Sequence, residues 1–339
     1  MGGNALSKPS ARIDKLEYET IVSTVLTKFA QWSFDNEFDT YSHPVDSYRT
    51  KDSFGDADIL YTFTGDNTSS ITTFIKESFG DVEIVKNGDV TSFDFDGFQI
   101  DMIYADPESF NFARGYFAFN DLGNFIGRTA HALGFKFGHD GLKYILRDED
   151  DDTRVVAELY LTQDFKSALK FLGFDPEVHL NGFDTPEEIF EYAASSEYFD
   201  PATFVFGNRN HTARVRDKKR KMYNAALNYY KEKFGVTDES VLEKKDRKAH
   251  LERARKTFIL FDLSMEKAID GHRINKAYRS VVNGSAVSEL TGLEGKDLGE
   301  VMKRINVYVT TYGLKYWIST LDENSGDDVL RVIVEESQR

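Results

Sequence analysis

The chain has 339 residues, more than one typical domain of about 100–200 residues, so we expect two or three lobes. It contains no cysteine, which excludes disulfides, thiolate metal sites and cysteine nucleophiles. The formal net charge of −15 argues against nonspecific binding of nucleic acid by the whole surface. No apolar run approaches the roughly 20 residues that span a membrane, and the N-terminus lacks a secretion signal. We therefore expect no membrane association and a cytoplasmic location.

Hydrophobic periodicity predicts a helix over residues 12–34, followed by a polar, turn-rich stretch that reaches residue 55. Short β-branched and aromatic runs then indicate a small sheet with one helix inserted between its strands. The predicted strands are 59–63, 82–85, 91–95 and 98–104, and the predicted helix is 70–79. This part of the chain therefore favours an α+β fold with a small mixed sheet.

The chain becomes more helical beyond residue 109. Helices are predicted at 128–133, 165–172 and 186–192, and a hairpin of strands 144–146 and 155–161 is joined by an acidic run. Helix dominates from residue 212 to the end, with a long stretch that begins at 225 and a last helical unit at 287–309. The only plausible domain boundary lies near Asp200-Pro201.

Two aspartates, Asp56 and Asp58, stand one residue apart at the entry to the strand predicted at 59–63. Side chains two residues apart on a strand point to the same face, so these carboxylates repel each other unless a cation lies between them. Mg²⁺ prefers oxygen ligands of this kind. Gly55 precedes the pair and permits a tight turn of the backbone.

A third acid, Asp101, lies inside the apolar strand predicted at 98–104, where a solvated carboxylate is not expected. If the two strands pair, three carboxylates can hold two divalent ions, Mg²⁺ or Mn²⁺. Ser47, Arg49 and Lys51 precede the acidic pair, and a hydroxyl and two cations suit the phosphates of a nucleotide. Taken alone, the Gly-Asp-x-Asp string also fits a surface turn. An EF-hand calcium loop is excluded because its bidentate Glu is missing.

These residues resemble the DNA polymerase β superfamily of nucleotidyltransferases, and family X DNA polymerases most closely. The palm of that family opens with a Gly-Ser-Phe/Tyr-Arg-Arg-Gly-Lys element, followed by Gly-Asp-x-Asp and a strand, and residues 47–60 are similar. The likeness covers residues 45–200, where Tyr116 and Phe117 match a sugar-facing Tyr-Phe turn before an Arg- and Ala-rich helix. It implies a polymerase β-like palm with two metal ions held by the catalytic residues Asp56, Asp58 and Asp101. The nucleotide-binding residues it implies are Ser47, Arg49, Lys51, Gly55, Tyr116 and Phe117.

The sequence also departs from the family X pattern. Asp46 replaces the first glycine of the element, and Ala118-Phe119-Asn120 replaces the Thr-Gly-Ser of the sugar-facing turn, which leaves ribose or deoxyribose selection open. Only about 45 residues precede the palm, too few for the DNA-binding helix-hairpin-helix units of that family. Residues 283–302 resemble instead a C-terminal element of tRNA nucleotidyltransferases, although an ordinary helix-turn-helix with glycine caps also fits.

Positive charge is concentrated between Arg209 and Lys256, where 16 basic and 7 acidic residues give a local net charge of +9. A solvated helical surface is one interpretation, and a local grip on phosphates is the other. On one helix, Arg216, Arg220 and Tyr223 would share a face, and the tyrosine could stack on a base. The predicted nucleic-acid-binding residues are Arg209, Arg214, Arg216, Lys219, Arg220 and Tyr223.

Together these patterns predict an N-terminal helix over 1–44, a nucleotidyltransferase palm and fingers-like region over 45–200, and a helical, partly basic lobe over 201–339. The expected activity is metal-dependent transfer of nucleoside monophosphates from NTP or dNTP to a polynucleotide 3′-hydroxyl, with an RNA, tRNA-like end preferred. The alternatives are a templated, gap-filling family X-like DNA polymerase, a catalytically inactive nucleic-acid-binding protein, and transfer to a protein or small molecule.

Overall fold

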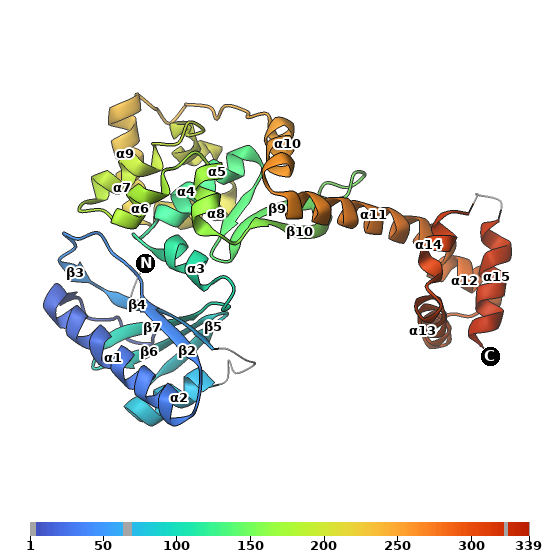
Figure 1. Ribbon diagram of the computed structural model, residues 1–339, viewed down its shortest axis with the longest axis horizontal. Coiled ribbons are helices and arrows are strands. Elements are labelled where there is room, and N and C mark those ends of the chain that lie inside the picture. The colour runs from blue at the N-terminus through green and yellow to red at the C-terminus, as the bar shows by residue number, and fades with distance from the viewer. Residues whose placement is uncertain (1–4, 64–69, 322–324, 339) are drawn as a thin grey trace. The chain divides into compact units, whose positions relative to one another are not determined.

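The computed structural model describes residues 5–63, 70–321 and 325–338. The protein has an α+β fold with a mixed sheet and a helical C-terminal part, as expected. Its chain divides into two compact units (Figure 1). Unit 1 comprises residues 1–145 and 158–261, and unit 2 comprises residues 146–157 and 262–339.

Unit 1 begins with a five-stranded sheet in the order β2-β4-β7-β6-β5. Its strands are β2 (Thr40–Pro44), β4 (Asp56–Phe63), β7 (Phe98–Tyr104), β6 (Val90–Phe95) and β5 (Ile84–Asn87). The two central strands, β4 and β7, run parallel, and every other neighbouring pair is antiparallel. The predicted mixed sheet is therefore confirmed, and the sequence missed only its edge strand β2.

Helices α1 (Lys15–Asp35) and α2 (Ser70–Phe79) cover one face of this sheet (Figure 1). Apolar side chains recur along one side of α1 and pack with Phe74 of α2 against Ile59 and Ile100 of the central strands. The side chain of Asp14 caps α1 by accepting a hydrogen bond from the Glu17 amide at 2.9 Å. A two-stranded ribbon of β1 (Ile13–Asp14) and β3 (Ser53–Phe54) ties the start of α1 to the residues before β4.

Helix α3 (Phe110–Phe117) packs on the opposite face of the sheet, where Leu60, Ile103 and Ala113 form a second, smaller apolar cluster. Side chains alternate along β4, so its acidic residues share the face of Leu60 while Ala57 and Ile59 face α1 and α2. The face of the sheet that packs on α1 and α2 is therefore apolar and buried. The opposite face carries polar residues at one end.

The rest of unit 1 is mainly helical and carries a small three-stranded sheet in the order β10-β9-β8. After α4 (Leu122–Leu133) come the strands β8 (Lys136–Gly138), β9 (Gly141–Arg147) and β10 (Val155–Thr162), of which the last two extend into unit 2. The helices that follow are α5 (Phe165–Phe171), α6 (Pro176–Asn181), α7 (Pro186–Ala193), α8 (His211–Lys218), α9 (Lys221–Phe234) and α10 (Arg247–Thr257), with the short 3-10 turns η1 (Pro201–Phe204) and η2 (Phe206–Asn208).

The structure of this region differs from the sequence-based expectations in two respects. The basic segment is not one long helix, because α8 ends at Lys218 and α9 begins at Lys221, and residues 235–246 are not helical. Residues near Asp200-Pro201 do not form a boundary between compact units, since η1 lies within unit 1 and packs against α4 and α9. The assignment of separate functional roles to residues 1–44, 45–200 and 201–339 stays a prediction.

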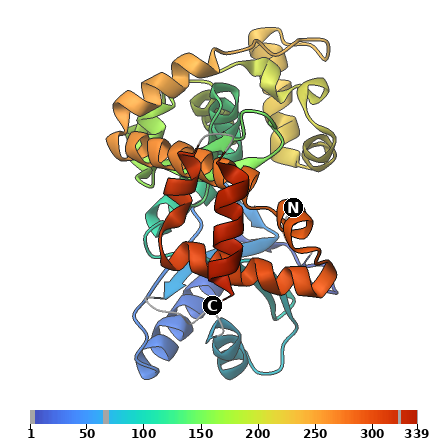
Figure 2. The ribbon, with the colours of Figure 1, turned by 90° about the vertical axis from the view of Figure 1, so that its right-hand side faces the viewer.

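Unit 2 is built from the C-terminal part of α11 (Ile259–Val281) and from α12 (Gly284–Thr291), α13 (Gly295–Thr311), α14 (Leu314–Ser319) and α15 (Gly326–Ser337) (Figure 2). These helices surround their own apolar core, which includes Val287, Ile305 and Ile333. The hairpin tip 146–157 also belongs to this unit: Lys276 of α11 pairs with Asp150, and the His272 ring lies 3.2 Å from the Asp148 carboxylate.

Within the residues that the structure describes, no helix is both long enough and apolar enough to cross a membrane.

Candidate functional site

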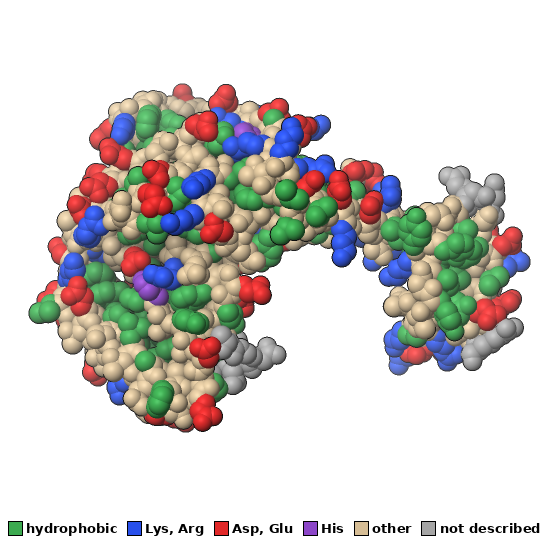
Figure 3. All heavy atoms as spheres, in the orientation of Figure 1, with side chains coloured by type: hydrophobic (Ala, Val, Ile, Leu, Met, Phe, Trp, Pro, Cys, Tyr) green, Lys and Arg blue, Asp and Glu red, His purple; other side chains and the backbone are tan. Residues whose placement is uncertain are grey.

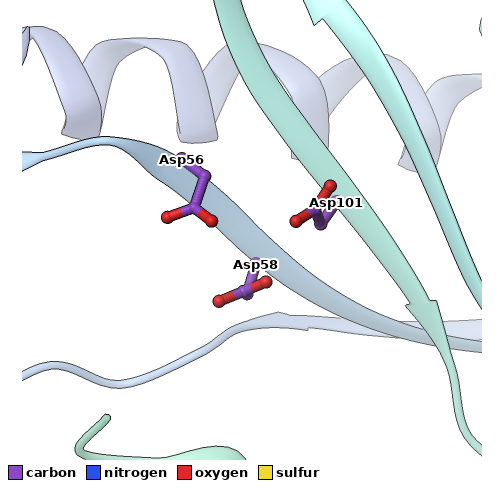
Figure 4. Close-up of side chains that lie close together, drawn as sticks. All are labelled: Asp56, Asp58 and Asp101. Carbon is purple, nitrogen blue, oxygen red and sulfur yellow. The ribbon is translucent and has the colours of Figure 1, made fainter. Parts of the chain in front are cut away.

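The three predicted acids lie together at one end of the central strands (Figure 4). Asp56 and Asp58 project from the same face of β4, and the parallel register of β4 and β7 sets Asp58 opposite Asp101. One carboxylate oxygen from each residue lies within 4.8 Å of the others. The sequence predicted this cluster only on the condition that the two strands pair, and that condition is met.

Asp101 is the most enclosed of the three acids, with 9% of its surface exposed. The Gln99 side-chain amide donates hydrogen bonds to both of its carboxylate oxygens, at 2.9 and 3.0 Å. Ser92, which lies opposite Asp101 on β6, donates a further hydrogen bond from its hydroxyl. These partners fix the orientation of the carboxylate before any ligand arrives.

The electrostatics of the cluster favour a cation. Burial, followed by the charges of Asp56 and Asp101, raises the pKa of Asp58 to about 7, although its side chain keeps some contact with solvent. Burial also raises the pKa of Asp101, and the charge of Asp56 adds to this, while hydrogen bonds from Ser92 and Gln99 oppose it. A divalent ion would neutralise this repulsion, and three carboxylates are the ligands that such ions prefer.

Lys51 is a cation whose charge opposes the rise in the pKa of Asp58. Its Nζ lies 4.4 Å from the centre of the Phe54 ring, and Tyr18 of α1 stacks on the same ring at 3.8 Å. Burial lowers the pKa of Lys51, and the charges of Asp56 and Asp58 raise it. The Tyr18 hydroxyl is close enough to the acids that their charges add to the effect of burial in raising its pKa.

Tyr18 and Phe54 were not predicted as site residues. Phe54 directly precedes Gly55 and the acidic pair, so its position in the sequence carried a signal. Tyr18 carried none, because it lies on a helix that was interpreted only through its apolar face. Gly55 forms the bend between β3 and β4, and its φ lies outside the left-handed region, so the predicted need for glycine there is not one of backbone conformation.

Arg49 and Ser47 differ from Lys51 in their surroundings. Arg49 forms an ion pair with Asp184 and donates a hydrogen bond from Nη1 to the Asn181 carbonyl at 2.8 Å. Its backbone amide donates to the Phe183 carbonyl at 2.9 Å, so this loop is fixed to residues 181–184. The side chain of Arg49 is still 57% exposed, and Ser47 is half-buried. Their predicted contact with phosphates stays a prediction.

Tyr116 and Phe117 end α3 and are both half-buried. Their rings meet edge to face at 5.3 Å, and the His139 ring stacks on Phe117 at 5.8 Å. The turn that follows keeps left-handed backbone geometry without glycine, because Phe119 and Asn120 have φ values of 60° and 63°. The Phe119 amide donates to the Asp46 carbonyl at 2.8 Å, which links this turn to the loop before β4.

A groove of about 640 Å³ follows α8, over which basic side chains gather (Figure 3). It is lined by His211, Thr212, Val215, Arg216, Lys219 and Arg220. Arg220 forms an ion pair with Asp121 at the start of α4. Burial raises the pKa of the Tyr116 hydroxyl, and the charges of Arg220 and Arg216 oppose this rise. The groove therefore adjoins the end of α3 within unit 1.

Two of the predicted nucleic-acid-binding residues, Tyr223 and Arg209, make contacts inside unit 1. Tyr223 is fully buried, and its hydroxyl donates a hydrogen bond to the Phe204 carbonyl at 2.5 Å. The prediction that Tyr223 stacks on a base is wrong, because the helix breaks before it and turns the ring inward. Arg209 lies 3.5 Å from the buried Asp217, which also binds Arg128 at 2.8 Å. Arg214 is half-buried on α8 and does not line the groove.

The C-terminal element predicted from residues 283–302 forms α12, a short turn and the start of α13. The Asn283 side chain caps α12 by accepting from the Ala286 amide at 3.0 Å, and Gly292 ends the helix with a φ of 68°. The helical unit expected at 287–309 is thus interrupted at residues 292–294.

The sequence matches no protein-family model, and no curated protein matches it at a significant level.

Proposed function

We propose that this protein is a metal-dependent nucleotidyltransferase with a polymerase β-like palm. The observation that supports this most is the cluster of Asp56, Asp58 and Asp101 on two adjacent parallel strands, with carboxylate oxygens within 4.8 Å of one another. Burial, and after it the charges of neighbouring acids, raise the pKa of Asp58 and Asp101, so a bound cation would stabilise their ionised forms. Carboxylates held this close by a rigid sheet fit a divalent ion better than they fit solvent.

These three residues would hold the metal, Mg²⁺ or Mn²⁺. When bound, such an ion supplies charge neutralisation at phosphate oxygens and lowers the pKa of a coordinated hydroxyl. Asp101 is oriented by Gln99 and Ser92, so it is suited to position the attacking hydroxyl. Lys51 lies beside the acids and is suited to contact the phosphates of a nucleotide.

The proposed reaction forms one bond and breaks another at the α-phosphorus. The 3′-oxygen of the acceptor attacks this phosphorus, the bond to the β-phosphate oxygen breaks, and pyrophosphate leaves with the bonding electrons. The hydroxyl proton passes to Asp101 or to solvent. Tyr116 and Phe117, on the face of the sheet that carries the acids, stay the candidates for contact with the sugar.

The groove along α8 is the proposed contact for the acceptor strand. Arg216, Lys219 and Arg220 line it without an acidic residue among the lining side chains, and Arg220 adjoins Tyr116. Arginine and lysine bind phosphate oxygens, and a local grip of this kind is compatible with a net charge of −15. An RNA end is the preferred acceptor because the chain also carries the tRNA nucleotidyltransferase-like element.

Primer extension tests the proposal. Labelled single-stranded RNA, a tRNA that lacks its terminal CCA and a gapped DNA duplex would be incubated with Mg²⁺ and each NTP or dNTP. Extension of RNA without a template supports the proposal, whereas template-directed extension of gapped DNA alone indicates a gap-filling polymerase. No extension of any substrate by folded protein would overturn transfer to a polynucleotide.

Asp56→Asn, Asp58→Asn and Asp101→Asn serve as the matched controls for that assay. Each should lower the rate by more than about 100-fold, because even residues that only orient metal ligands contribute about 10–100-fold. Full activity in these variants would exclude the cluster as the active site.

The groove is tested by the salt dependence of RNA binding. Arg216→Glu with Lys219→Glu should weaken binding and reduce the slope of log K against log salt by about 1 for each phosphate that the protein no longer neutralises. Lys233→Glu is the control, since Lys233 pairs with Glu191 and does not line the groove. An unchanged slope in the double variant would exclude the groove as the RNA-binding surface.

A further inference from the structure

Residues 5–11, called here the N-terminal segment, contact the start of β7 ahead of the acids. The Ala5 backbone amide donates a hydrogen bond to the side-chain oxygen Oε1 of Gln99 at 2.9 Å. The Ser10 hydroxyl accepts a hydrogen bond from the Gln99 backbone amide, also at 2.9 Å. These partners are 94 and 89 residues from Gln99 in the chain, so the fold alone brings them to this glutamine.

Gln99 passes this contact on to the acidic cluster. Its side chain is buried, with 2% of the residue exposed, and its Nε2 donates to both carboxylate oxygens of Asp101 at 2.9 and 3.0 Å. The Ala5 amide is a donor, so it can bind only the oxygen of the Gln99 side chain, and the nitrogen must face Asp101. The hydrogen bonds therefore form a relay that runs from Ala5 through Gln99 to Asp101.

The N-terminal segment is held by hydrogen bonds more than by burial. All of its residues are described; none lies in a helix or strand, and each is exposed or half-buried. The Ser7 amide and hydroxyl donate to the two carboxylate oxygens of Glu83, at 2.8 and 2.7 Å. The Ala11 amide donates to the Gly97 carbonyl at 3.0 Å. The position of the segment thus depends on a few specific contacts, which single substitutions can remove.

We propose that the N-terminal segment is a positioning element of the proposed metal site: the Ala5 amide holds Gln99, and Gln99 holds the Asp101 carboxylate ready for the ion. The inference rests on the proposed function, because it takes Asp101 as a metal ligand. A free glutamine side chain samples several rotamers, and fixing one of them on binding costs free energy. The segment fixes the rotamer beforehand, and partners that orient a ligand in this way raise metal affinity.

A purely structural role of the segment makes different predictions. If the Ala5 contact only stabilised the fold, its loss would lower the free energy of unfolding and leave the metal affinity of the folded protein unchanged. If the contact acts through Gln99, its loss weakens metal binding, and this effect disappears once Gln99 can no longer form hydrogen bonds.

The first measurement is binding of Mn²⁺ alone to the full-length protein by titration calorimetry. Ala5→Pro removes the amide hydrogen that Gln99 accepts and should weaken Mn²⁺ binding about two- to tenfold, the effect of releasing one long side chain. Ala5→Gly keeps that hydrogen and is the matched control, with the affinity of the wild type expected. Equal or tighter Mn²⁺ binding by folded Ala5→Pro overturns the proposal.

A double-mutant cycle tests whether the effect passes through Gln99. Gln99→Met keeps the length of the side chain and removes its amide, and it should itself weaken Mn²⁺ binding. Adding Ala5→Pro to Gln99→Met should cause no further loss, because the relay is already broken. If Ala5→Pro weakens binding by the same factor with and without Gln99, the relay is overturned.

Glu83→Ala takes the place of Ala5→Pro if the proline variant does not fold. It removes the carboxylate that anchors Ser7 and lies on an exposed residue, so it should weaken Mn²⁺ binding in the same direction. Asp81→Ala removes an equal charge two residues away and is its matched control. A Glu83→Ala protein that binds Mn²⁺ as Asp81→Ala does would overturn the role of the segment.

Asp101→Asn separates failure of this inference from failure of the proposed function. If the wild type and Asp101→Asn bind Mn²⁺ equally, Asp101 is not a metal ligand, and the proposed function is overturned together with the inference. If Asp101→Asn loses Mn²⁺ binding while Ala5→Pro retains it in full, only the positioning role of the N-terminal segment is overturned.

Discussion

At the scale of single residues, Asp58 has both other acids of the cluster as close neighbours. It lies beside Asp56 on β4 and opposite Asp101 on β7, so both neighbours act on it at short range. Burial and these two charges raise its pKa to about 7, against the usual value near 4. The rigid sheet prevents the carboxylates from separating, and the repulsion is therefore stored in the fold until a cation relieves it.

This repulsion predicts an unusual dependence of stability on pH in the absence of metal. The folded state holds the Asp58 proton more tightly than the unfolded state, so it binds more protons between about pH 4 and pH 7. The unfolding free energy contributed by this group should fall as pH rises through that window, by up to about 1.4 kcal/mol per pH unit. Urea unfolding with EDTA, at several pH values, measures this.

Asp58→Asn is the comparison for that experiment, because it removes the titrating proton and keeps the shape of the side chain. The wild type should lose stability relative to the variant from pH 5 to pH 7, and added Mn²⁺ should restore it at pH 7 because ligands bind metal in the ionised form. Parallel curves for the two proteins would show that Asp58 does not carry this charge repulsion.

At the scale of elements, the join between α3 and α4 determines where Tyr116 lies. The α3 helix ends at Phe117, and α4 begins five residues later, after a turn with two left-handed residues. A Cβ placed on Gly123 in the first turn of α4 would lie 2.1 Å from the Tyr116 carbonyl oxygen. Only glycine permits this approach, so the two helices are closer here than any side chain would allow.

Gly123→Ala should therefore destabilise the protein by about 1–3 kcal/mol, because the backbone oxygen cannot move aside as a flexible side chain would. Gly127→Ala, one turn later in the same helix, is the control: its nearest neighbour lies at 3.6 Å, and alanine favours helix by about 1 kcal/mol. Denaturant unfolding of both variants measures the difference. Equal stability of the two would show that α3 and α4 are not in close contact at Gly123.

The elements that could be predicted from the sequence are those with strong local patterns. The central strands β4 and β7 and the helices α1 and α2 were found from apolar runs and periodicity, with ends displaced by a few residues. The edge strand β2 was missed because Tyr41, Ser42 and His43 have no strong strand pattern and gain their strand conformation only by pairing with β4. The break between α8 and α9 was missed for a related reason. Tyr223 does not share a helix face with Arg216 and Arg220, because its ring packs in the core of unit 1.

The candidate site was predictable where its chemistry lies in short motifs. Asp56 and Asp58 are one residue apart, and Asp101 stands out inside an apolar strand, so all three could be named. The different surroundings of Lys51 and Arg49 could not be predicted, because Lys51 lies over the Phe54 ring whereas Arg49 pairs with Asp184. Gln99 and Ser92 reach Asp101 only through strand alternation and pairing, which fix register across the sheet.

At the scale of the whole molecule, the acids and the basic groove both belong to unit 1, whereas unit 2 has a core of its own. Unit 2 also presents exposed aromatic and aliphatic side chains, among them Tyr316, Trp317 and Val332 on α14 and α15. Each unit buries its apolar residues internally, so each has its own source of stability. The proposed chemistry of unit 1 should then persist when unit 2 loses its structure.

The two tryptophans make this testable, because one lies in each unit. Trp32 is 8% exposed in the core beneath the sheet, and Trp317 is 49% exposed on α14. Trp317→Phe leaves fluorescence that reports unit 1 alone, and Trp32→Phe leaves fluorescence that reports unit 2 alone.

Urea titrations should give two different midpoints, since separate cores of different size unfold independently. Mn²⁺ should raise only the midpoint reported by Trp32, because the acids lie in unit 1 and a ligand stabilises the state that binds it. Coincident midpoints that shift together with Mn²⁺ would show instead that the two units unfold as one.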